Sequence, residues 1–354
     1  MNFWQQLKQK KNRPLIVLAP MADVTDFAFR AMFAKYGKPD VFWTEFVSAD
    51  GMVMAPNNNP DERGMTGQDK IFEDLKFDES QRPIVAQIFG SRLENLEKAA
   101  QICVELGFDG IDINMGCPDR SIEKQKSGAA MMKNPELAVE VIRAVKKGIE
   151  NAEKNGFKKI PVSVKTRLGY NKDELEEWLP KLLAEKPAVI TVHARTRKEM
   201  SLVPARWERV KRAVEIRDEV QADLPMEERT LIFGNGDVES VADGLKKCGE
   251  TGADGAMVGR GIFGNPWFFA NLNNNRKVLN TEISLNDKLQ ALIEHSELFE
   301  KNIGHKNFAV MKKHFKAYVE GFDGAKELRT KLMEAEKVSD VREIINNWLE
   351  NKVI

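Results

Sequence analysis

The stretch at residues 109–120, DGIDINMGCPDR, shows the pattern from which the fold of the chain can be predicted. Its first half is typical of a buried β-strand, because two isoleucines alternate with an aspartate. The apolar run stops at Asn114, and a glycine, a cysteine and a proline follow. A cysteine that only packs would more naturally lie inside the strand or on the apolar face of a helix. The segment therefore predicts a buried strand whose polar end carries Cys117 in a loop.

Short apolar runs of this kind recur along the chain, and longer segments of helical periodicity often follow them. In the segment 134–150, for example, Asn134 is the expected N-cap and Pro135 the expected first helical residue. Eight such alternations with nearly continuous apolar strands predict an α/β fold, in which a parallel sheet closes into a (β/α)₈ TIM barrel. We expect strands near residues 15–19, 41–44, 84–88, 110–113, 162–165, 189–192, 230–233 and 255–258.

From about Asn271 the alternation stops, and four segments with helical patterns follow. The sequence thus predicts a barrel domain at residues 1–270 and an all-helical domain at residues 271–354. Two polar segments, 55–81 and 214–229, interrupt the barrel pattern as insertions, and neither resembles a functional site. The predicted helices lie at 286–304, 307–322, 325–336 and 338–350.

The composition narrows the possible classes of protein. Lysine and arginine number 54 and aspartate and glutamate 54, which argues against nucleic-acid binding through overall charge but leaves room for a local basic face. No stretch approaches the roughly 20 apolar residues that a membrane span needs, and the N-terminus carries no secretory signal. Three scattered cysteines fit neither a disulfide framework nor a zinc site. We expect a cytoplasmic protein that does not contact a membrane.

Polar or turn-forming residues follow all eight predicted strands. In a barrel of this kind the carboxyl ends of the strands meet at one mouth, where the chemistry takes place. A single lysine or histidine is more often a surface or core residue, but their combined placement favours a polar ligand cradle. No HxxxH pair or carboxylate cluster occurs, so we expect no metal. In strand order the residues are Pro20-Met21-Ala22, Glu45, Gln87, Asn114 with Cys117, Lys165 with Arg167, His193 with Arg195, Asn235-Gly236-Asp237, and Gly259-Arg260.

The loops after the seventh and eighth strands are the most specific part of this pattern, since they frequently bind phosphate in this fold. The segments FGNGDV (233–238) and MVGRGIFGNPW (257–267) supply glycines that let backbone N–H groups approach an anion, with Arg260 as a charged partner. One such glycine pair alone would indicate only a turn. Two of them at the expected strands predict a phosphate site.

Eight motifs that occur in order along the barrel resemble those of the tRNA-dihydrouridine synthase family. They are APMADVTDFAFR, VAQIFGS, DGIDINMGCP, SGAAMM, VSVKTRLG, HARTRKEM, GNGDV and DGAMVGRG. The segment HFKAYVEGFDGAKELRTKLM resembles the start of the family's C-terminal helical domain. This resemblance implies an FMN enzyme that reduces the C5–C6 double bond of particular uridines in tRNA, with NADPH as the electron donor.

The resemblance also implies roles for individual residues, with Cys117 as the catalytic acid. After hydride transfer to C6 of uracil, negative charge develops over C5 and the C4 carbonyl, and an acid must protonate C5. A free thiol with a pKa near ~8.5 is mostly protonated at neutral pH and can supply that proton. The plainer alternative is a buried, inert cysteine. The residues expected to hold FMN are Pro20, Met21, Ala22, Gln87, Lys165, His193, Asn235, Gly236, Asp237, Gly259 and Arg260.

A tRNA substrate would need contacts beyond the flavin. We expect substrate contacts from Asn114 and Arg167 at the mouth, and from Arg195 and Arg197 to the nearest RNA backbone. Lys312 and Lys316 are four residues apart on one helix face, with Lys313 beside them, and this basic face is expected to hold RNA. A solvated helix surface is the plainer interpretation of these lysines. We expect the protein to act as a monomer.

Two other functions stay open on the sequence alone. An FMN barrel could act on a free small molecule, as dihydroorotate dehydrogenases do, although such a substrate needs no helical docking domain. A non-catalytic RNA-binding barrel is the second alternative, and the joint presence of Cys117, Lys165 and His193 argues against it.

Overall fold

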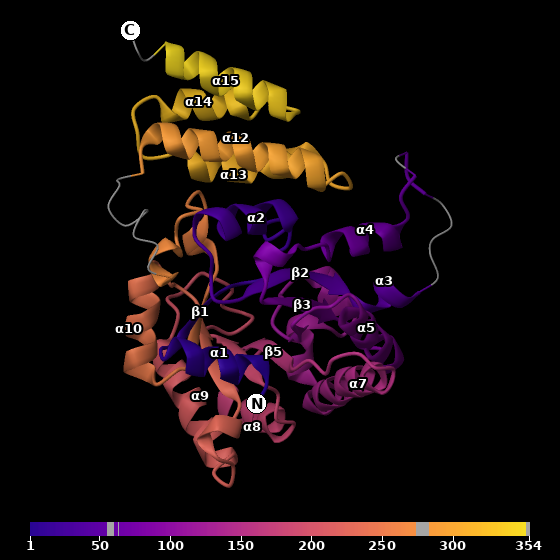
Figure 1. Cartoon of the computed structure of the whole chain (residues 1–354). Coiled ribbons are helices and arrows are strands. Elements are labelled where there is room, and N and C mark those ends of the chain that lie inside the picture. Colours follow the sequence, from indigo (N-terminus) through magenta and orange to yellow (C-terminus); the bar gives the residue numbers. More distant parts are fainter. Residues whose placement is uncertain (55–59, 63, 274–282, 352–354) are drawn as a thin grey trace.

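A computed structural model describes the chain except for residues 55–59, 63, 274–282 and 352–354. Eight parallel strands form one curled sheet in the order β1-β8-β7-β6-β5-β4-β3-β2 (Figure 1), which confirms the predicted TIM-like α/β fold. The N–H groups of Asp40 and Leu18 donate to the carbonyls of Ile16 and Val41, at 2.9 and 3.2 Å, and bring β1 next to the start of β2. The strands are β1 (Leu15–Leu18), β2 (Phe42–Ser48), β3 (Ile84–Phe89), β4 (Gly110–Asn114), β5 (Val162–Arg167), β6 (Val189–His193), β7 (Leu231–Asn235) and β8 (Gly255–Val258).

All eight predicted strands are present, and six of them, β2 to β7, end one to four residues later than predicted. Strand β2 continues to Ser48, because its pairing with β3 resumes at Phe46 after a register shift between Trp43 and Phe46. The polar residue Glu45 lies in this shift, which explains why the apolar pattern broke there. Strand β7 extends to Asn235, which pairs with Met257 of β8.

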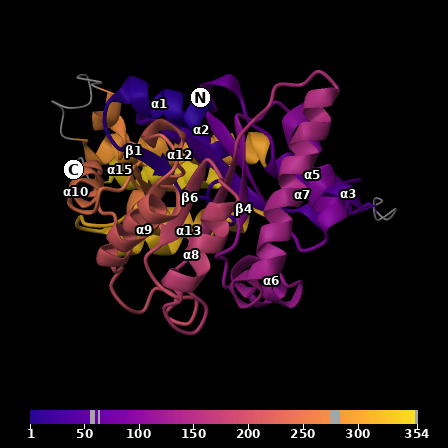
Figure 2. The ribbon, with the colours of Figure 1, turned by 90° about the horizontal axis from the view of Figure 1, so that it is seen from below.

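Helices cover the outside of the sheet (Figure 2), and their bounds follow the sequence pattern closely. The Asn134 side chain accepts a hydrogen bond from Leu137 N at 3.2 Å, which confirms the predicted N-cap. The helices of the barrel are α1 (Phe3–Lys11), α2 (Phe27–Tyr36), α3 (Ala49–Val53), α4 (Gly67–Asp74), α5 (Leu93–Glu105), α6 (Arg120–Lys124), α7 (Pro135–Lys154), α8 (Leu175–Ala184), α9 (Trp207–Val220) and α10 (Val241–Thr251). Short 3₁₀ turns are η1 (Glu79–Gln81), η2 (Gly128–Lys133), η3 (Met226–Glu228), η4 (Arg260–Ile262) and η5 (Ala270–Asn273).

The interior of the barrel has an apolar lower part that α1 closes. Trp4 of α1 is fully buried, with its ring centroid 5.3 Å from that of Trp43 and 5.7 Å from that of Phe233. Aliphatic side chains such as Val17 and Val189 complete this inner cluster. With one end filled by side chains, the opposite end, where the strands finish, is left for polar chemistry.

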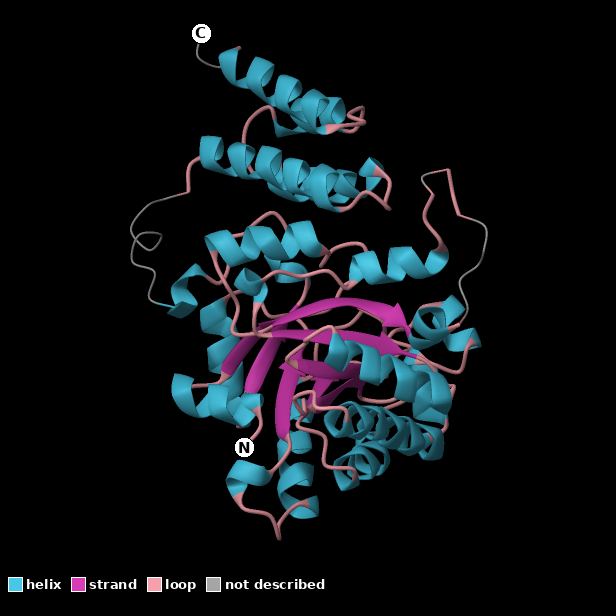
Figure 3. Ribbon diagram, turned by 45° about the vertical axis from the view of Figure 1, so that its right-hand side comes forward, coloured by secondary structure: helices cyan, strands magenta, loops and turns pink. Residues whose placement is uncertain are grey.

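The C-terminal helices α12 (Leu285–Asn302), α13 (Lys312–Tyr318), α14 (Ala325–Leu332) and α15 (Val338–Glu350), with η6 (Phe308–Met311), stack next to α2 (Figures 1 and 3). They have a hydrophobic core of their own, and α2 contributes Ala28 and Met32 to it. Helix α2 thus faces the sheet with Phe29 and Phe33 and the helical layer with its other side.

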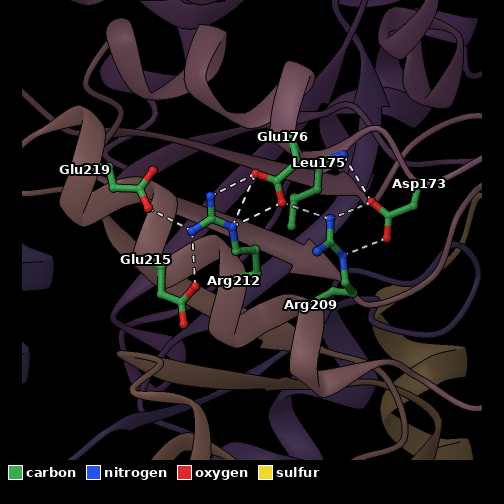
Figure 4. Close-up of polar contacts among 7 residues, drawn as sticks. All are labelled: Asp173, Leu175, Glu176, Arg209, Arg212, Glu215 and Glu219. Atoms are coloured by element: carbon green, nitrogen blue, oxygen red, sulfur yellow. Dashed lines mark hydrogen bonds and ion pairs between the residues drawn. The ribbon is translucent and has the colours of Figure 1, made fainter.

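Of the two predicted insertions, 214–229 forms the last turns of α9, the turn η3 and the approach to β7. Charged side chains join α9 to the segment around α8 (Figure 4). Arg209 donates to Asp173 at 2.8 and 3.0 Å, while Arg212 contacts Glu176 and two glutamates of its own helix. In the other insertion, 55–81, the described residues include α4 and η1, and residues 55–59 and 63 lie outside the described part.

The contact between α5 and α7 supplies a test of this packing, because these helices cover the strands that carry Gln87 and Asn114. A Cβ on Gly148 of α7 would lie 2.0 Å from Glu97 O of α5, so Gly148→Ala must push the helices apart. We expect a loss of about 1–3 kcal/mol in the free energy of unfolding, measured by urea denaturation. Gly249→Ala in α10 is the control, because its Cβ meets nothing within 4 Å. That variant should gain about 0.5–1 kcal/mol, and equal effects of the two would contradict the packing.

Candidate functional site at the carboxyl ends of the strands

The predicted strand-end residues meet at one end of the barrel, since the parallel register aligns the strand ends. Asn114 of β4 pairs with Lys165 of β5, and His193 of β6 pairs with Arg167 of β5 and with Asn235 of β7. Side chains two apart along a strand point to the same face. The last inward-facing residues of neighbouring strands therefore form a continuous polar layer above the apolar interior.

A cavity of about 630 Å³ opens at this end of the barrel, within the usual size range of small-molecule sites. It is lined by most of the residues expected to hold a cofactor, whereas Ala22, Gln87 and Cys117 do not line it. Arg167 and Arg195, expected to contact substrate, line it as well. The expected cofactor residues in its wall are Pro20, Met21, Lys165, His193, Asn235, Gly236, Asp237, Gly259 and Arg260.

Lys165 places an amine at the base of the cavity. Its Nζ donates to Asn235 Oδ1 at 3.1 Å, and Asn235 Nδ2 donates onward to Met257 O at 2.8 Å. Burial lowers the pKa of Lys165 to about 8, and the positive charge of Arg167 adds to this effect. The amine is thus largely protonated at pH 7 and can also lose its proton within the physiological range.

His193 is held neutral by its surroundings. Burial lowers its pKa well below the ordinary value, and the cations Arg167 and Lys165 lower it further. Arg195 Nη1 lies 3.2 Å from His193 Nε2, and an arginine can only donate, so Nε2 accepts and the proton is assigned to Nδ1. The side chain thereby offers one fixed tautomer to the cavity.

The loops after β7 and β8 form the glycine-rich wall of the cavity, and this wall carries Arg260. Gly236 has φ +121°, a conformation that favours glycine, and a Cβ there would lie 2.8 Å from that of Ala205. The Arg260 side chain is 66% exposed, and its guanidinium is 4.0 Å from Asp237 Oδ1. Its remaining N–H groups can therefore meet an anion, which fits the predicted phosphate site.

Cys117 lies in a loop that several polar contacts fix above β4. Asn114 Oδ1 accepts hydrogen bonds from Gly116 N at 3.1 Å and Cys117 N at 2.9 Å. Arg167 Nε donates to Gly116 O at 2.7 Å, and Ala129 N donates to Cys117 O at 2.9 Å. The loop is therefore held by the end of its own strand, by β5 and by the following segment.

The thiol itself is partly exposed and keeps its proton at neutral pH. Burial raises the pKa of Cys117, while Lys165 and Arg167 are near enough to oppose that rise. The other two cysteines, Cys103 and Cys248, are buried away from this end. Of the three, Cys117 alone combines access with a place at the strand ends.

Gln87 lies below the mouth of the barrel. Ala22 lies beside the mouth, in the β1–α2 loop. Gln87 is fully buried, and its Oε1 accepts a hydrogen bond from Asn114 Nδ2 at 3.1 Å. Ala22 is exposed and follows Met21, which lines the cavity. Gln87 is thus tied to the loop of Cys117 through Asn114.

The two arginines expected to contact the RNA backbone both form ion pairs within the protein. Arg195 is almost fully buried, and it donates to Val203 O at 2.6 Å and to Asp237 Oδ2 at 2.5 Å, so it belongs to the cavity wall. Arg197 donates to Glu123 at 2.8 and 2.6 Å and braces the segment after Cys117. The partner of Arg195 lies on the loop after β7, and the partner of Arg197 lies in α6.

The three lysines expected to form a basic face differ in their surroundings. Lys316 is exposed and Lys312 is partly buried at the start of α13. Lys313 Nζ donates to Asp23 O at 2.7 Å and so reaches the β1–α2 loop. The helix α13 therefore lies beside the mouth of the barrel.

A buried ion cluster that the sequence did not reveal joins the helical layer to the mouth. Lys306 Nζ lies 2.7 Å from Glu45 Oε2 and 3.1 Å from Asp74 Oδ1, and His305 Nε2 lies 2.8 Å from the same Asp74 oxygen. Burial raises the pKa of Glu45 to about 7, with Lys306 opposing. Glu45 is recognisable as a strand-end residue, but nothing in the local sequence pairs it with Lys306.

Within the described part of the chain, His, Cys, Asp and Glu side chains form no group of three that could hold a metal ion. None of the described helices is both long and apolar enough to cross a bilayer.

Comparisons with known proteins find one family along almost the whole chain. The family model described as Dihydrouridine synthase (Dus) matches residues 17–353. The chain is 38% identical to a probable tRNA-dihydrouridine synthase 2 of Bacillus subtilis strain 168, over 98% of this chain and 96% of that protein. It is 36% identical to a probable tRNA-dihydrouridine synthase of Staphylococcus epidermidis RP62A, with the same coverage.

The solved structures add a likeness in fold. Histamine dehydrogenase from Rhizobium sp. 4-9 matches with a TM-score of 0.50 and 12% sequence identity, over 80% of this chain and 48% of that one. At this level of identity the match shows a likeness in fold alone.

The ion cluster at the junction gives a prediction about stability. Lys306→Met leaves the buried Glu45 without its cation and removes one of the two partners of the half-buried Asp74, and we expect a loss of about 3–5 kcal/mol in the free energy of unfolding. The measurement is urea denaturation at pH 7. Lys35→Met is the matched control, because it removes a more exposed ion pair with Glu294 and should cost about 1 kcal/mol or less. A loss for Lys306→Met no larger than that of the control would show that the cluster does not hold the two parts together.

Proposed function

Because the chain belongs to the dihydrouridine synthase family, we propose that it is an FMN-dependent reductase that converts particular uridines of tRNA to 5,6-dihydrouridine, with NADPH as electron donor. The observation that carries this proposal is the cavity at the strand ends, whose wall contains Lys165, His193 and Arg260. Cys117 lies beside this cavity, in the loop that follows β4. A binding module would not need a protonated thiol and a buried amine at the same mouth.

The residues present fit FMN on two observations. Arg260 extends into the cavity beside the turn at Gly236, where a side chain would clash, and together they suit a phosphate. Lys165, which is buried and has a cationic neighbour, suits an electron-rich ring edge. When bound, the flavin supplies a hydride to C6 of uracil. Pro20, Met21, Ala22 and Gln87 are the residues we assign to the ring, and His193 to its polar edge.

Cys117 is then the proton donor to C5. Its pKa is raised by burial, so the thiol carries its proton at neutral pH. Asn114 holds the loop through two backbone N–H groups, and Arg167 holds it through Gly116 O. These contacts fix the height of the thiol above the strand ends, which general acid catalysis requires. Asn114 and Arg167 are also the residues we assign to the uracil and its nucleotide.

The tRNA is proposed to lie across the mouth and α13. Lys316 is exposed on α13, Lys312 is its neighbour one turn earlier, and Lys313 links α13 to the mouth. Basic side chains on one face suit the phosphates of an RNA backbone. We assign residues 1–270 to catalysis and 271–354 to RNA docking, in a monomer that acts in the cytoplasm.

The experiment that tests this function is dihydrouridine mapping. Transfer RNA from cells with and without the gene is compared position by position, and the gene is expressed again from a plasmid. We expect specific positions to lose dihydrouridine without the gene and to regain it on re-expression. Unchanged tRNA, together with a purified protein that takes up no FMN, would overturn the proposal. A protein that binds FMN but leaves tRNA unchanged would instead favour a small-molecule substrate.

Cys117→Ala separates flavin reduction from RNA reduction. We expect the variant to bind FMN and to be reduced by NADPH as the parent is, because the thiol acts only on uracil. Formation of dihydrouridine should fall by about 10²–10⁴-fold, as measured by single-turnover assays with tRNA. Cys103→Ala, which removes a fully buried thiol of α5, should keep near-parental activity. Near-parental RNA reduction by Cys117→Ala would exclude the role of the thiol.

The same assay has a predicted pH dependence. A thiol donates its proton only below its pKa, and burial raises that of Cys117 above the ordinary value near ~8.5. The rate of dihydrouridine formation should therefore stay level through pH 8 and fall only at more alkaline pH. A fall that begins below pH 8 would show that another group supplies the proton.

Arg260→Ala tests the phosphate site. Loss of a charge-assisted contact in an open part of the cavity should weaken FMN binding by about tenfold, as measured by titrating flavin-free protein. Arg143→Ala is a matched control, since the Arg143 side chain is also 66% exposed. It belongs to the outer helix α7 and does not line the cavity. An unchanged dissociation constant for Arg260→Ala would place the phosphate elsewhere.

A further inference from the structure

A carboxylate lies inside the barrel, below the mouth, and nothing in the proposed reaction uses it directly. Asp112 is in the middle of β4, its side chain is fully buried, and it shares the barrel interior with Trp43 and Phe233. Burial raises the pKa of Asp112 to about 6, so ionisation is costly but still prevails at pH 7. A charge kept in such a place needs a reason.

The contacts of Asp112 are short and specific. Its Oδ2 accepts a hydrogen bond from Gln87 Nε2 at 2.6 Å, and its Oδ1 accepts one from Ser163 Oγ at 2.6 Å. An ionised carboxylate only accepts hydrogen bonds, whereas the two ends of a glutamine amide differ. Asp112 therefore forces the NH₂ group of Gln87 to face it and the oxygen of Gln87 to face the other way.

One more side chain, that of Asn114, passes this orientation on to the loop of Cys117. Gln87 Oε1 accepts from Asn114 Nδ2 at 3.1 Å, which turns the oxygen of Asn114 toward the loop. That oxygen accepts from Gly116 N and Cys117 N, at 3.1 and 2.9 Å. Every link in the chain has its donor and acceptor ends set by the link before it.

We infer that Asp112 is a positioning residue, which sets the amide orientation of Gln87 and Asn114 and through them holds the loop that carries Cys117. The inference rests on the proposed function in so far as Gln87 contacts the flavin and Cys117 protonates uracil. It assigns to Asp112 no contact with cofactor or RNA.

Reversing the two side-chain amides shows what the Asp112 carboxylate prevents. If the amide of Gln87 turned around, its NH₂ group would face the NH₂ group of Asn114. Asn114 would then have to turn as well, and its NH₂ group would face two backbone N–H groups that need an acceptor. The loop of Cys117 would lose its anchor, so a single acceptor below the mouth fixes the geometry above it.

Three variants test the inference. Asp112→Leu removes the acceptor and is expected to release the loop. Asp112→Asn keeps an oxygen for Gln87, because its NH₂ group can donate to the Ser163 hydroxyl, and is expected to rescue the orientation without the charge. Thr191→Val is the control for a polar change inside the barrel, since the buried Thr191 hydroxyl has no hydrogen-bond partner.

The first readout is the rate at which iodoacetamide alkylates Cys117 in the full-length protein, followed by mass spectrometry. It needs neither RNA nor turnover. We expect Asp112→Leu to be alkylated about tenfold faster than the parent, since an anchor of the loop is lost. Asp112→Asn and Thr191→Val should stay near the parental rate. Parental alkylation of a folded Asp112→Leu, or an Asp112→Asn as fast as Asp112→Leu, would overturn the inference.

The second readout separates positioning from stability. In assays with FMN, NADPH and tRNA, kcat of Asp112→Leu should fall by about 10- to 100-fold with KM for tRNA unchanged, and Asp112→Asn should restore most of it. If Asp112→Leu does not fold, Gln87→Leu removes the next link and carries the same expectation for the alkylation rate. A parent that forms no dihydrouridine would refute the proposed function, while the alkylation rates would still decide the role of Asp112.

Discussion

Parallel pairing of β4 with β3 and β5 is the constraint on which the site depends. It sets Gln87 against Asp112 and Asn114 against Lys165, and all four side chains enter the barrel near its mouth. A slip of β4 by one residue would turn Asp112 and Asn114 to the outer face. The apolar alternation around Asp112 makes this register the one that buries Ile111 and Ile113 against the outer helices.

Placing polar and charged side chains above the apolar interior of the barrel costs desolvation free energy, which their hydrogen bonds at the mouth offset. Lys165 has Asn235 as its hydrogen-bond partner, and Arg167 donates to three backbone carbonyls of the surrounding loops. Arg195 ties the segment after β6 to the loop after β7 through Asp237. The same guanidiniums that fasten these loops make the cavity positive, which suits an anionic cofactor.

The helical layer is joined to the barrel through both apolar and charged contacts. Helix α2 shares the core of the C-terminal helices, while Lys306 reaches Glu45, which lies in the register shift of β2. Glu45 also accepts a hydrogen bond from Asp23 N in the β1–α2 loop. The surface that we assign to tRNA is therefore fixed relative to the mouth at several points, as a substrate that spans both would require.

Sequence patterns predicted the parts of this arrangement that depend on local chemistry. Apolar runs gave the eight strands, and Asn134 with Pro135 gave the start of α7. The environment of Arg195 and the partner of Glu45 could not be predicted in this way. Lys306 lies 261 residues from Glu45, and whether an arginine faces solvent or a carboxylate depends on how distant loops fold together. The burial of α2 on two sides could not be predicted either, because its second side packs against helices that are distant in the sequence.

The most direct measurement of the central claim is a single turnover without oxygen. Protein reduced by NADPH is mixed with unmodified tRNA transcript, and the flavin absorbance and the dihydrouridine content are followed in the same sample. We predict that oxidised flavin and dihydrouridine appear together and in equal amounts. Free uridine, added instead of the transcript, should not oxidise the flavin. Flavin that stays reduced in the presence of tRNA, or that is oxidised without dihydrouridine being formed, would contradict it.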